Sequence, residues 1–454
     1  YESYISQIIE KKKHVLTKEP AVYFCTSSGS VGEPKIVPIT EADLNIQYVY
    51  AYGAVLGMVR EHYGNLPETE VFGKIFQIGE FAKMYMDNGT MRGIRSSCIY
   101  QWLDRNSLFD ASDYCVPKEV LFPDTLEDLL YVKVRFALDQ PDIRAIHGVF
   151  INRVWGVMDY IRRKWNLLLE DMEQGKVHEY IPLGKKWREY VKENLPPNPV
   201  RARQLRSLFP EEPGAGMVEK IWPDMRYILA AGGKPFSCYM DRLKEYTGTI
   251  PIHYYAYAAS EGIFGIARSV DEPDAYILFP EAGFFEFLPV TGGQKENGQP
   301  WFLWELSKGE KYELLFTNRS GLYRYRMGDV IEVVDWYNHA PVVRFCYRRS
   351  QVLNAAGEKT NQEQIEEAIE RFAVKTGIRL AGYCVQEEMR GKVPGYLFYM
   401  ECCQEECFSN AYGRSGVLAE EVLDECLSCA NYQYRSRRTL GLIRSPRISY
   451  LQEG

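Results

Sequence analysis

The chain has 454 residues, a length at which one compact core normally gives way to two or more domains. Hydrophobic residues make up 46% of the chain and charged residues 25%, which is typical of an ordinary globular protein. The formal net charge of −7 disfavours a protein whose main partner is a nucleic-acid backbone, because phosphate binding needs clustered Lys and Arg. No apolar run approaches the roughly 20 residues of a membrane-spanning helix, so we expect neither a nucleic acid nor a membrane as partner.

The start of the chain and its cysteines bear on its origin. The sequence begins at Tyr1 without a Met and shows no signal-peptide pattern, so we expect a piece trimmed from a longer protein. The eleven cysteines lack the spacing of a secreted disulfide framework, and we therefore expect reduced thiols and a cytoplasmic location.

A group of cysteines near the C-terminal end could be a metal site or a set of buried thiols. A structural zinc site needs four ligands that converge from two pairs. The helical periodicity around Cys426 and Cys429 instead favours thiols buried on an amphipathic helix. The group consists of Cys402, Cys403, Cys407, Cys426 and Cys429.

The first half of the chain is predicted to be mainly helical. Residues 1–17 have the pattern of an amphipathic helix, residues 21–25 that of a short buried strand, and residues 36–63 that of a long helix. Residues 149–172 give the clearest helix, because large apolar side chains recur at three- and four-residue steps. This helix belongs either to the core or to the wall of an acyl pocket, since ligand pockets are mostly apolar.

The second half alternates short strand-like runs with turns and then changes pattern. Strand-like runs dominate residues 227–334, for example 275–279 and 312–316. A compact α+β unit of about 100 residues follows. Its predicted elements are a helix at 362–375, strands at 380–386 and 395–401, and a helix at 417–430.

A loop rich in Gly and Ser follows the first predicted strand, at residues 26–35. Small residues let backbone N–H groups approach an anion closely, while hydroxyls and a Lys add donors for phosphate oxygens. The loop lacks the spacing of a Walker motif, and such a turn is often only a turn. Its candidate phosphate-binding residues are Ser27, Ser28, Gly29, Ser30, Gly32 and Lys35.

Residues 257–262 bring three chemical groups into one short segment. Tyr257 offers a ring that can stack on adenine, and Ser260 offers a hydroxyl for an α-phosphate. Glu261 offers a carboxylate for Mg²⁺, which typically takes one or two carboxylates plus phosphate oxygens. Read alone, the segment is better explained as a turn at the end of a strand.

Two glycine-containing turns complete the set. Asp329 follows Gly328 at a strand end, where a carboxylate can accept hydrogen bonds from both ribose hydroxyls, although Gly-Asp is also a common β-turn. Gly232 and Gly233 follow another predicted strand and either bring backbone close to an adenine edge or form an ordinary turn.

The order of these motifs resembles the adenylate-forming superfamily and, more closely, the auxin-responsive acyl acid–amido synthetases of the Gretchen Hagen family. The narrower resemblance covers nearly the whole chain and rests on residues 1–9, 222–225, 257–265, 323–329 and 431–442. It implies an α/β fold with a large multi-layer N-terminal adenylating domain, residues 1–347. A hinge at 348–351 and a small mobile α+β domain at 352–454, expected to be truncated, would follow.

The resemblance also implies an activity: ATP-dependent, AMP-forming activation of a carboxylic acid as its acyl-adenylate, followed by transfer to an amine such as an amino acid. Lys35, Ser30 and Glu261 would be catalytic, with Glu261 holding Mg²⁺. Arg348 falls where the superfamily places an Arg near the nucleotide. The expected cofactors are ATP and Mg²⁺.

Three departures from the family pattern leave other functions open. Val31 stands where a Thr or Ser is usual, Ser350 and Gln351 replace an acidic hinge residue, and the chain ends before any late Lys used for adenylation. Val31 lacks the hydroxyl of a Thr or Ser, and the loss of a hydrogen bond to a charged phosphate oxygen costs about 1.5–3 kcal/mol. The alternatives are an acyl-CoA ligase and a non-catalytic relative that binds a nucleotide or an acid.

Overall fold

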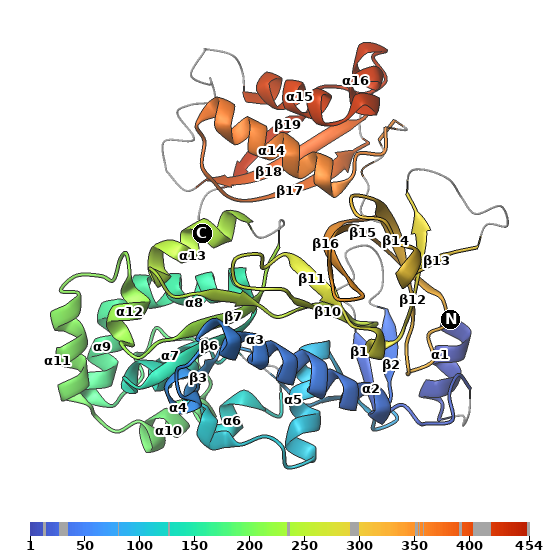
Figure 1. The fold of residues 1–454 in the computed structure, drawn as a ribbon. Helices are drawn as coiled ribbons and strands as arrows, with labels where there is room; N and C mark the ends of the chain where they lie inside the picture. Colours follow the sequence, from blue (N-terminus) through green and yellow to red (C-terminus); the bar gives the residue numbers. More distant parts are fainter. Residues whose placement is uncertain are drawn as a thin grey trace.

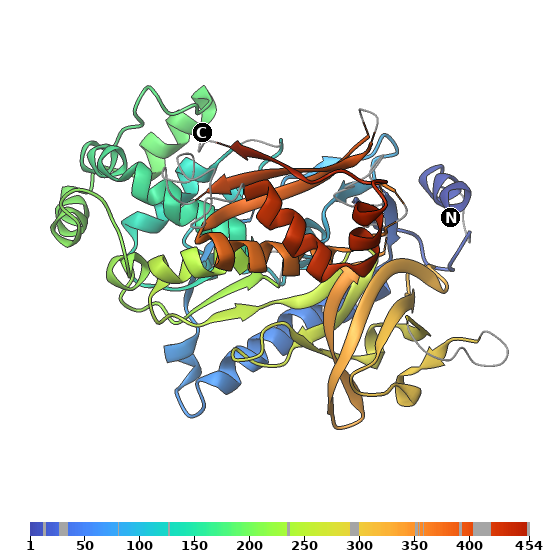
Figure 2. The ribbon, with the colours of Figure 1, turned by 90° about the horizontal axis from the view of Figure 1, so that it is seen from above.

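The computed structural model of the chain describes residues 1–11, 15–26, 35–79, 81–125, 128–233, 237–290, 299–349, 353, 355–356, 358–389, 393–402 and 419–451. Figure 1 shows a large body of several sheets and many helices, with a small unit above it that runs from α14 to β19. Figure 2, seen from above, shows the small unit lying across the large body. Helix α13 (Ser237–Thr247) of the large body contacts strand β17 (Leu380–Glu388) of the small unit.

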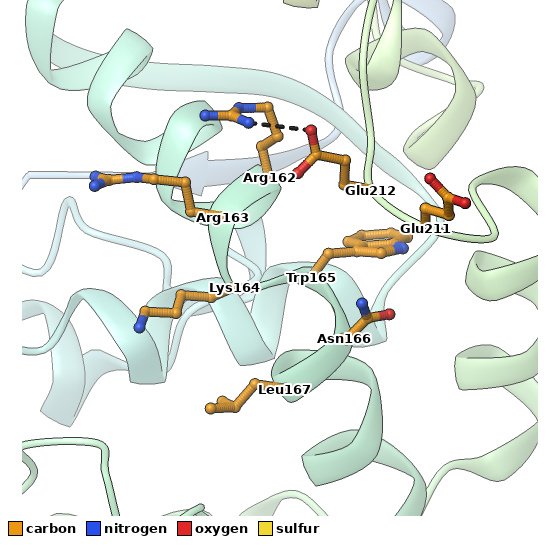
Figure 3. A pocket seen from close by; sticks show the side chains of 8 residues that line it. All are labelled: Arg162, Arg163, Lys164, Trp165, Asn166, Leu167, Glu211 and Glu212. Atoms are coloured by element: carbon orange, nitrogen blue, oxygen red, sulfur yellow. Dashed lines mark hydrogen bonds and ion pairs between the residues drawn. The ribbon is translucent and has the colours of Figure 1, made fainter.

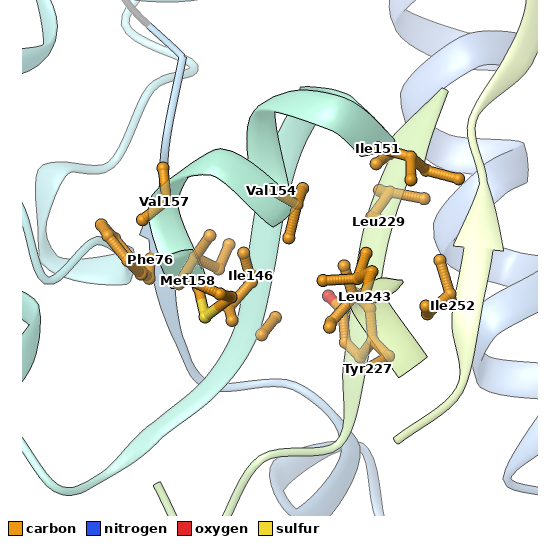
Figure 4. Close-up of a cluster of buried hydrophobic side chains, with 14 of the residues drawn as sticks. Phe76, Ile146, Ile151, Val154, Val157, Met158, Tyr227, Leu229, Leu243 and Ile252 are labelled. Carbon is orange, nitrogen blue, oxygen red and sulfur yellow. The ribbon is translucent and has the colours of Figure 1, made fainter. Parts of the chain in front are cut away.

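A parallel sheet in the order β3-β6-β7-β8 organises one side of the large body. Parallel strands are normally buried on both faces, and the strand sequences here are correspondingly apolar. Helix α8 packs on β6 and β7, and Figure 4 shows its side chains Ile151, Val154 and Met158 lying against this sheet. The strands are β3 (Lys74–Gln77), β6 (Ile143–Phe150), β7 (Tyr227–Ala231) and β8 (Ile252–Tyr254).

The helices around this sheet make up most of the first half of the chain. Most are short, and the apolar faces of most of them join one large core of buried side chains, whereas Leu44 and Trp102 pack in a smaller cluster with Tyr23 and Val37. They are α2 (Glu41–Ile46), α3 (Ala54–His62), α4 (Glu68–Val71), α5 (Arg95–Arg105), α6 (Lys118–Leu121), α7 (Leu130–Asp139), α8 (Ile151–Arg163), α9 (Trp165–Gln174), α10 (Lys185–Asn194), α11 (Pro199–Leu208) and α12 (Met217–Ile221).

Two further sheets carry the predicted site motifs. A four-stranded sheet has the order β2-β1-β5-β4, and an eight-stranded antiparallel sheet has the order β13-β12-β14-β15-β16-β11-β10-β9. The small sheet consists of β1 (Tyr23–Thr26), β2 (Ile36–Ile39), β4 (Met84–Tyr85) and β5 (Met91–Gly93). The large sheet consists of β9 (Ala256–Ala259), β10 (Gly262–Ala267), β11 (Ala275–Leu278), β12 (Phe284–Pro289), β13 (Trp301–Phe302), β14 (Lys311–Thr317), β15 (Tyr325–Tyr337) and β16 (Ala340–Arg348).

The small C-terminal unit has its own hydrophobic core, built from residues between 355 and 443. Helix α14 begins with a capping box in which Asn361 and Gln364 exchange side-chain-to-backbone hydrogen bonds of 3.0 Å. The four elements predicted here are confirmed as α14 (Gln362–Thr376), β17, β18 (Gly395–Cys402) and α15 (Ala419–Ala430). Helix α16 (Tyr432–Thr439) and strand β19 (Arg447–Leu451), which pairs with β18, were not predicted.

Three element predictions in the large body are wrong. The N-terminal helix, α1, spans only Glu2–Ile9, and Lys11 follows it with a φ of 60°, which a helix does not accommodate. Residues 36–39 form strand β2, because the β-branched Ile36, Val37 and Ile39 surround a Pro that disfavours a helix. The helix that follows begins at Glu41 and contains a π-helical segment, Gln47–Gly53. Residues 237–247, within the stretch predicted to alternate strands and turns, form α13.

A fourth element prediction, the helix at 149–172, is also wrong: residues 149–150 end β6, and two helices, α8 and α9, follow in place of one. The helical stretch breaks at Lys164, and the break lets the buried Trp165 donate its indole N–H to the Phe209 carbonyl at 3.0 Å. The apolar residues Val154, Met158, Trp165 and others of this pattern are fully buried, so they belong to the core. In the described parts of the chain, no helix is long and apolar enough to cross a bilayer.

Candidate active site

A buried cluster joins two of the predicted motifs. The Tyr257 hydroxyl donates a hydrogen bond to Asp329 Oδ2 at 2.8 Å, and Arg348 Nε donates to Asp329 Oδ1 at 2.5 Å. Asp329 is 1% exposed and Tyr257 is 7% exposed. Burial, and then the charge of Asp329, raise the pKa of Tyr257. Burial works against the charged form of Arg348, but its hydrogen bond to Asp329 outweighs this and the net effect raises the pKa of Arg348.

The backbone of two adjacent strands places Asp329 and Arg348 together. The two residues are directly opposite in the antiparallel pairing of β15 and β16. Gly328, which precedes Asp329, has a φ of 83°, a conformation that favours glycine. The register shifts between Val330 and Ile331, and such a bulge re-aims the side chains beside it.

The ring of Tyr257 is enclosed by aromatic neighbours. Its centroid lies 4.9 Å from that of Phe264, 5.9 Å from that of Tyr276 and 6.1 Å from that of Phe345. The hydroxyl is thus committed to Asp329 and the ring is packed in the core. This arrangement gives Tyr257 a role in positioning Asp329 that the sequence did not predict, while its stacking on adenine stays a prediction.

Glu261 lies at the turn between β9 and β10, beside this cluster. It is 7% exposed, and within the described residues its carboxylate makes no hydrogen bond or ion pair. The charge of Glu261 does act on Arg348, so the two side chains are neighbours. A buried carboxylate is costly unless it is paired or binds a cation, so the residue fits the expected Mg²⁺ ligand.

The ends of the predicted phosphate loop come to the same place. Strands β1 and β2 form a hairpin in which Thr26 pairs with Ile36. At one end, burial raises the pKa of the Cys25 thiol, an effect partly offset by the charge of Arg95 and then by a hydrogen bond with the Ser260 side chain. The predicted residues Ser27, Ser28, Gly29, Ser30, Gly32 and the unusual Val31 lie outside the described residues.

Lys35 stands at the other end of this loop. Its Nζ donates to the hydroxyl of Tyr325 at 3.4 Å, and it lies 5.9 Å from the centre of that ring. Tyr325 belongs to β15, the strand that carries Asp329. The structure therefore brings Ser260, Glu261 and Asp329 into one region and joins Lys35 to the strand that carries Asp329, while the roles of these residues stay predictions.

Gly232 and Gly233 follow β7 at the carboxyl edge of the parallel sheet. A Cβ at Gly232 would overlap the ring of Tyr254, and Gly233 has a φ of 131°. Tyr254 ends β8, three residues before Tyr257. Close packing thus explains the glycine at position 232, and contact of this turn with adenine stays a prediction.

Two polar residues at this site escaped sequence reasoning. Arg95 donates to the Ser260 carbonyl through Nε at 3.2 Å and Nη2 at 2.7 Å, and Asn318 Nδ2 donates to the Glu261 carbonyl at 2.8 Å. Nothing in the local sequence separates Arg95 from the other Lys and Arg of the chain. Both residues act on backbone that is more than 50 positions away, so only the fold identifies them.

Other candidates in the chain lie apart from this region. A surface cavity of about 460 Å³ beside the α8–α9 junction contains none of the predicted site residues (Figure 3). Its Arg162 is engaged by Asp159 and Glu212. Cys426 is buried in the core of the small unit, and no group of three possible metal ligands occurs among the residues that the structure describes.

Comparison with known proteins places the chain in a family. Residues 1–252, 276–348 and 363–454 match the GH3 family N-terminal, central and C-terminal domains, respectively. The chain is 27% identical over 412 residues to the indole-3-acetic acid-amido synthetase GH3.8 of Oryza sativa subsp. indica. The matched region covers 88% of this chain and 67% of that protein. It is 26% identical over 465 residues to the jasmonoyl–L-amino acid synthetase GH3.5 of Oryza sativa subsp. japonica. This match covers 95% of this chain and 75% of that protein.

A solved structure supports the fold. The AtGH3.15 acyl acid amido synthetase in complex with 2,4-DB has a TM-score of 0.82 and 21% identity, covering 100% of this chain and 79% of that one. The fold and the matches define an enzyme of the ligase class. The chain belongs to the GH3 family. The predicted family and the predicted α/β fold, with a large N-terminal part and a small C-terminal part, are confirmed.

Proposed function

We propose that the chain is an ATP-dependent, AMP-forming ligase that activates a carboxylic acid as its acyl-adenylate and joins the acyl group to the amine of an amino acid. Membership of the GH3 family supports this function. The observation that carries it is the convergence of Tyr257 and Arg348 on Asp329, with Glu261 beside them and the Cys25 end of the glycine- and serine-rich loop next to Ser260.

Each residue in this cluster has a chemical task in the proposal. Asp329 has about four acceptor positions, of which Tyr257 and Arg348 use two, so two are left for the ribose hydroxyls of ATP. Glu261 would hold Mg²⁺, which when bound neutralises charge on the phosphates. Lys35 and Ser30 donate to phosphate oxygens, and Ser260 lies near the α-phosphate.

Two half-reactions follow from this arrangement. A substrate carboxylate oxygen bonds to the α-phosphorus, and the bond from that phosphorus to pyrophosphate breaks. The amine nitrogen then bonds to the acyl carbon, AMP leaves with the bonding electrons, and the nitrogen loses a proton. The residues act mainly by positioning the reactants. Such positioning lowers the activation barrier, by about 7–11 kcal/mol in the best cases.

Exchange of labelled pyrophosphate into ATP tests the first half-reaction. A screen of acids should begin with indole-3-acetic and jasmonic acids, for which the two relatives above are named. We expect exchange to depend on one class of acid and to collapse in Glu261→Ala. Absence of exchange across a broad screen, with ATP binding intact, would identify a non-catalytic relative instead.

Product analysis tests the second half-reaction. With the acid that supports exchange, we expect an amide when amino acids are supplied and no thioester when CoA is supplied. A thioester product would show an acyl-CoA ligase. The acid is thereby identified first and the amine second, so the amine assignment can fail while the acid assignment stands.

The domain organisation and location belong to the same proposal. We place a hinge at 348–351, between a large domain of residues 1–347 and a small domain of residues 352–454. Residues 350 and 351 lie outside the described part of the chain. A cytoplasmic location is supported by the spacing of the cysteines, which lacks the pattern of a secreted disulfide framework.

A further inference from the structure

Arg95 is a buried cation that braces one peptide of the candidate site. Its side chain is 10% exposed and lies at the start of α5. Two of its nitrogens donate to the carbonyl of Ser260, and a third, Nη1, lies 3.2 Å from Asp43 Oδ2. All three nitrogens of the guanidinium therefore have a partner.

The partners of Arg95 come from separate segments. Asp43 belongs to α2 and also accepts a hydrogen bond from Gln47 at 2.9 Å. Arg95 follows Gly93, which pairs with Cys25 at the end of β1, where the predicted phosphate loop begins. The Arg95 side chain thus ties α2 to the turn that contains Glu261, and the strand that precedes Arg95 pairs with the loop-bearing hairpin.

The backbone of this turn is held at two consecutive carbonyls. Arg95 holds the carbonyl of Ser260, and Asn318 holds the carbonyl of Glu261. Asn318 is itself fixed, because its Oδ1 accepts from the backbone N–H groups of Ser320 and Leu322. With both peptides fixed, the Glu261 side chain leaves the backbone in one direction.

We propose that Arg95 is a positioning residue that fixes the Ser260–Glu261 turn and so aims the Glu261 carboxylate at the Mg²⁺ of bound Mg·ATP. The inference rests on the proposed function. A lysine cannot replace this arginine, because an ammonium lacks the planar fork that reaches the carbonyl with two nitrogens and Asp43 with a third. Residues that orient a metal ligand typically change metal affinity by about 10–100-fold when they are replaced.

The test compares Arg95→Lys with a matched control. Arg201 is also a buried arginine that holds two backbone carbonyls, those of Leu138 and Ile221, but it lies away from the site. Binding of ATP is measured by titration calorimetry on the full chain, once with Mg²⁺ and once with EDTA. Thermal unfolding of each variant reports whether it folds, and each substitution is also made in a Glu261→Gln background.

We expect Arg95→Lys to weaken binding of Mg·ATP by about 10–100-fold and to change binding of metal-free ATP less than about twofold. Arg201→Lys should change neither. In the Glu261→Gln background, Arg95→Lys should add less than about twofold, because the carboxylate that it aims is gone. Should Arg95→Lys not fold, Asp43→Asn is measured by the same criteria.

Other results would overturn the inference in distinguishable ways. Equal losses with and without Mg²⁺, or a full loss in the Glu261→Gln background, would show that Arg95 only stabilises the fold. If Arg95→Lys folds and binds Mg·ATP as the wild type does, the contacts of Arg95 are not needed to position Glu261. Wild-type Mg·ATP binding by Glu261→Gln itself would overturn the metal role in the proposed function as well.

Discussion

The hydroxyl of Tyr257 lies 2.8 Å from the carboxylate of Asp329, although four strand-to-strand steps of the large sheet separate their strands. Neighbouring strands are 4.7–4.9 Å apart, so a flat sheet would hold β9 and β15 about 19 Å from each other. The sheet must therefore curl strongly between them. Register shifts in the β9–β10 and β15–β16 pairings are devices that increase such curvature.

Under the proposed function, in which Asp329 binds the ribose of ATP, this contact links the Tyr257 hydroxyl to nucleotide binding. We expect Tyr257→Phe to weaken ATP binding about tenfold, because a hydrogen bond to a buried carboxylate contributes about 1.5–3 kcal/mol and Asp329 would lose one of two partners. Titration calorimetry measures the loss. Tyr276→Phe is the matched control, since Tyr276 packs against the Tyr257 ring at 5.9 Å and makes no contact with Asp329. Equal affinities for both variants would contradict the prediction.

Gly232 provides a test of packing beside the site. A Cβ there would overlap the Tyr254 ring and approach Ile151 Cδ1 at 2.6 Å, so we expect Gly232→Ala to destabilise the fold by about 1–3 kcal/mol. Gly57, in α3, is the opposite case, because nothing lies within 4 Å of an added Cβ. Gly57→Ala should stabilise the fold by up to about 1 kcal/mol. Denaturant unfolding measures the free energy of unfolding of both variants. A Gly232→Ala variant as stable as the wild type would contradict the packing described.

Local patterns predicted the elements whose stability is mainly local. Helix α14 carries its own capping box and a C-terminal Gly377 with a φ of 73°, so its bounds could be read to within one residue at the C-terminal end. Strand β2 was missed because its four residues directly adjoin a helix, although its β-branched residues and Pro favour the strand that pairing with β1 completes. Helix α13 was missed because short strands surround it on both sides.

In the candidate site, too, local patterns revealed some residues and only the fold revealed others. Tyr257, Glu261 and Asp329 could be found because each lies in a short phrase with its own chemistry. The contacts of Arg95 and Asn318 could not, because they join residues 165 and 57 positions apart and leave no local pattern. Sequence therefore proposes groups that would act on a ligand, whereas only the fold shows the residues that hold those groups in place.

Acid should destabilise the protein through a buried histidine. Burial lowers the pKa of His147 to about 3, from an ordinary value of 6.5, while its Nε2 lies 3.3 Å from the Tyr227 hydroxyl. Because the unfolded chain binds the proton more tightly, the folded state loses stability as the pH falls below about 6.5, reaching about 3 kcal/mol at pH 4. Burial also lowers the pKa of His253, to about 4, so its contribution has the same sign.

Chemical denaturation at pH 8 and pH 4 measures this loss. We expect His147→Phe to remove about 3 kcal/mol of the difference between the two pH values, while the part due to His253 remains. His339 is exposed, so His339→Asn is the control and should keep the full wild-type difference in stability between the two pH values. An unchanged difference in His147→Phe would show that the buried ring does not govern acid stability.

An ion pair between the large body and the small unit provides a test of domain movement. Lys311 Nζ on β14 lies 2.7 Å from a carboxylate oxygen of Glu363 on α14, and both side chains are about one-third exposed (32% and 30%). A partly exposed pair contributes about 0.2–1 kcal/mol, enough to shift the balance between two orientations up to about fivefold. If the small domain reorients between the half-reactions, Glu363→Lys should change the ratio of pyrophosphate exchange to amide formation by about that factor, with little loss of thermal stability. The swapped double variant, Lys311→Glu with Glu363→Lys, restores the pair and should restore the ratio, whereas a ratio that is unchanged in the single variant would show that this contact does not control the movement.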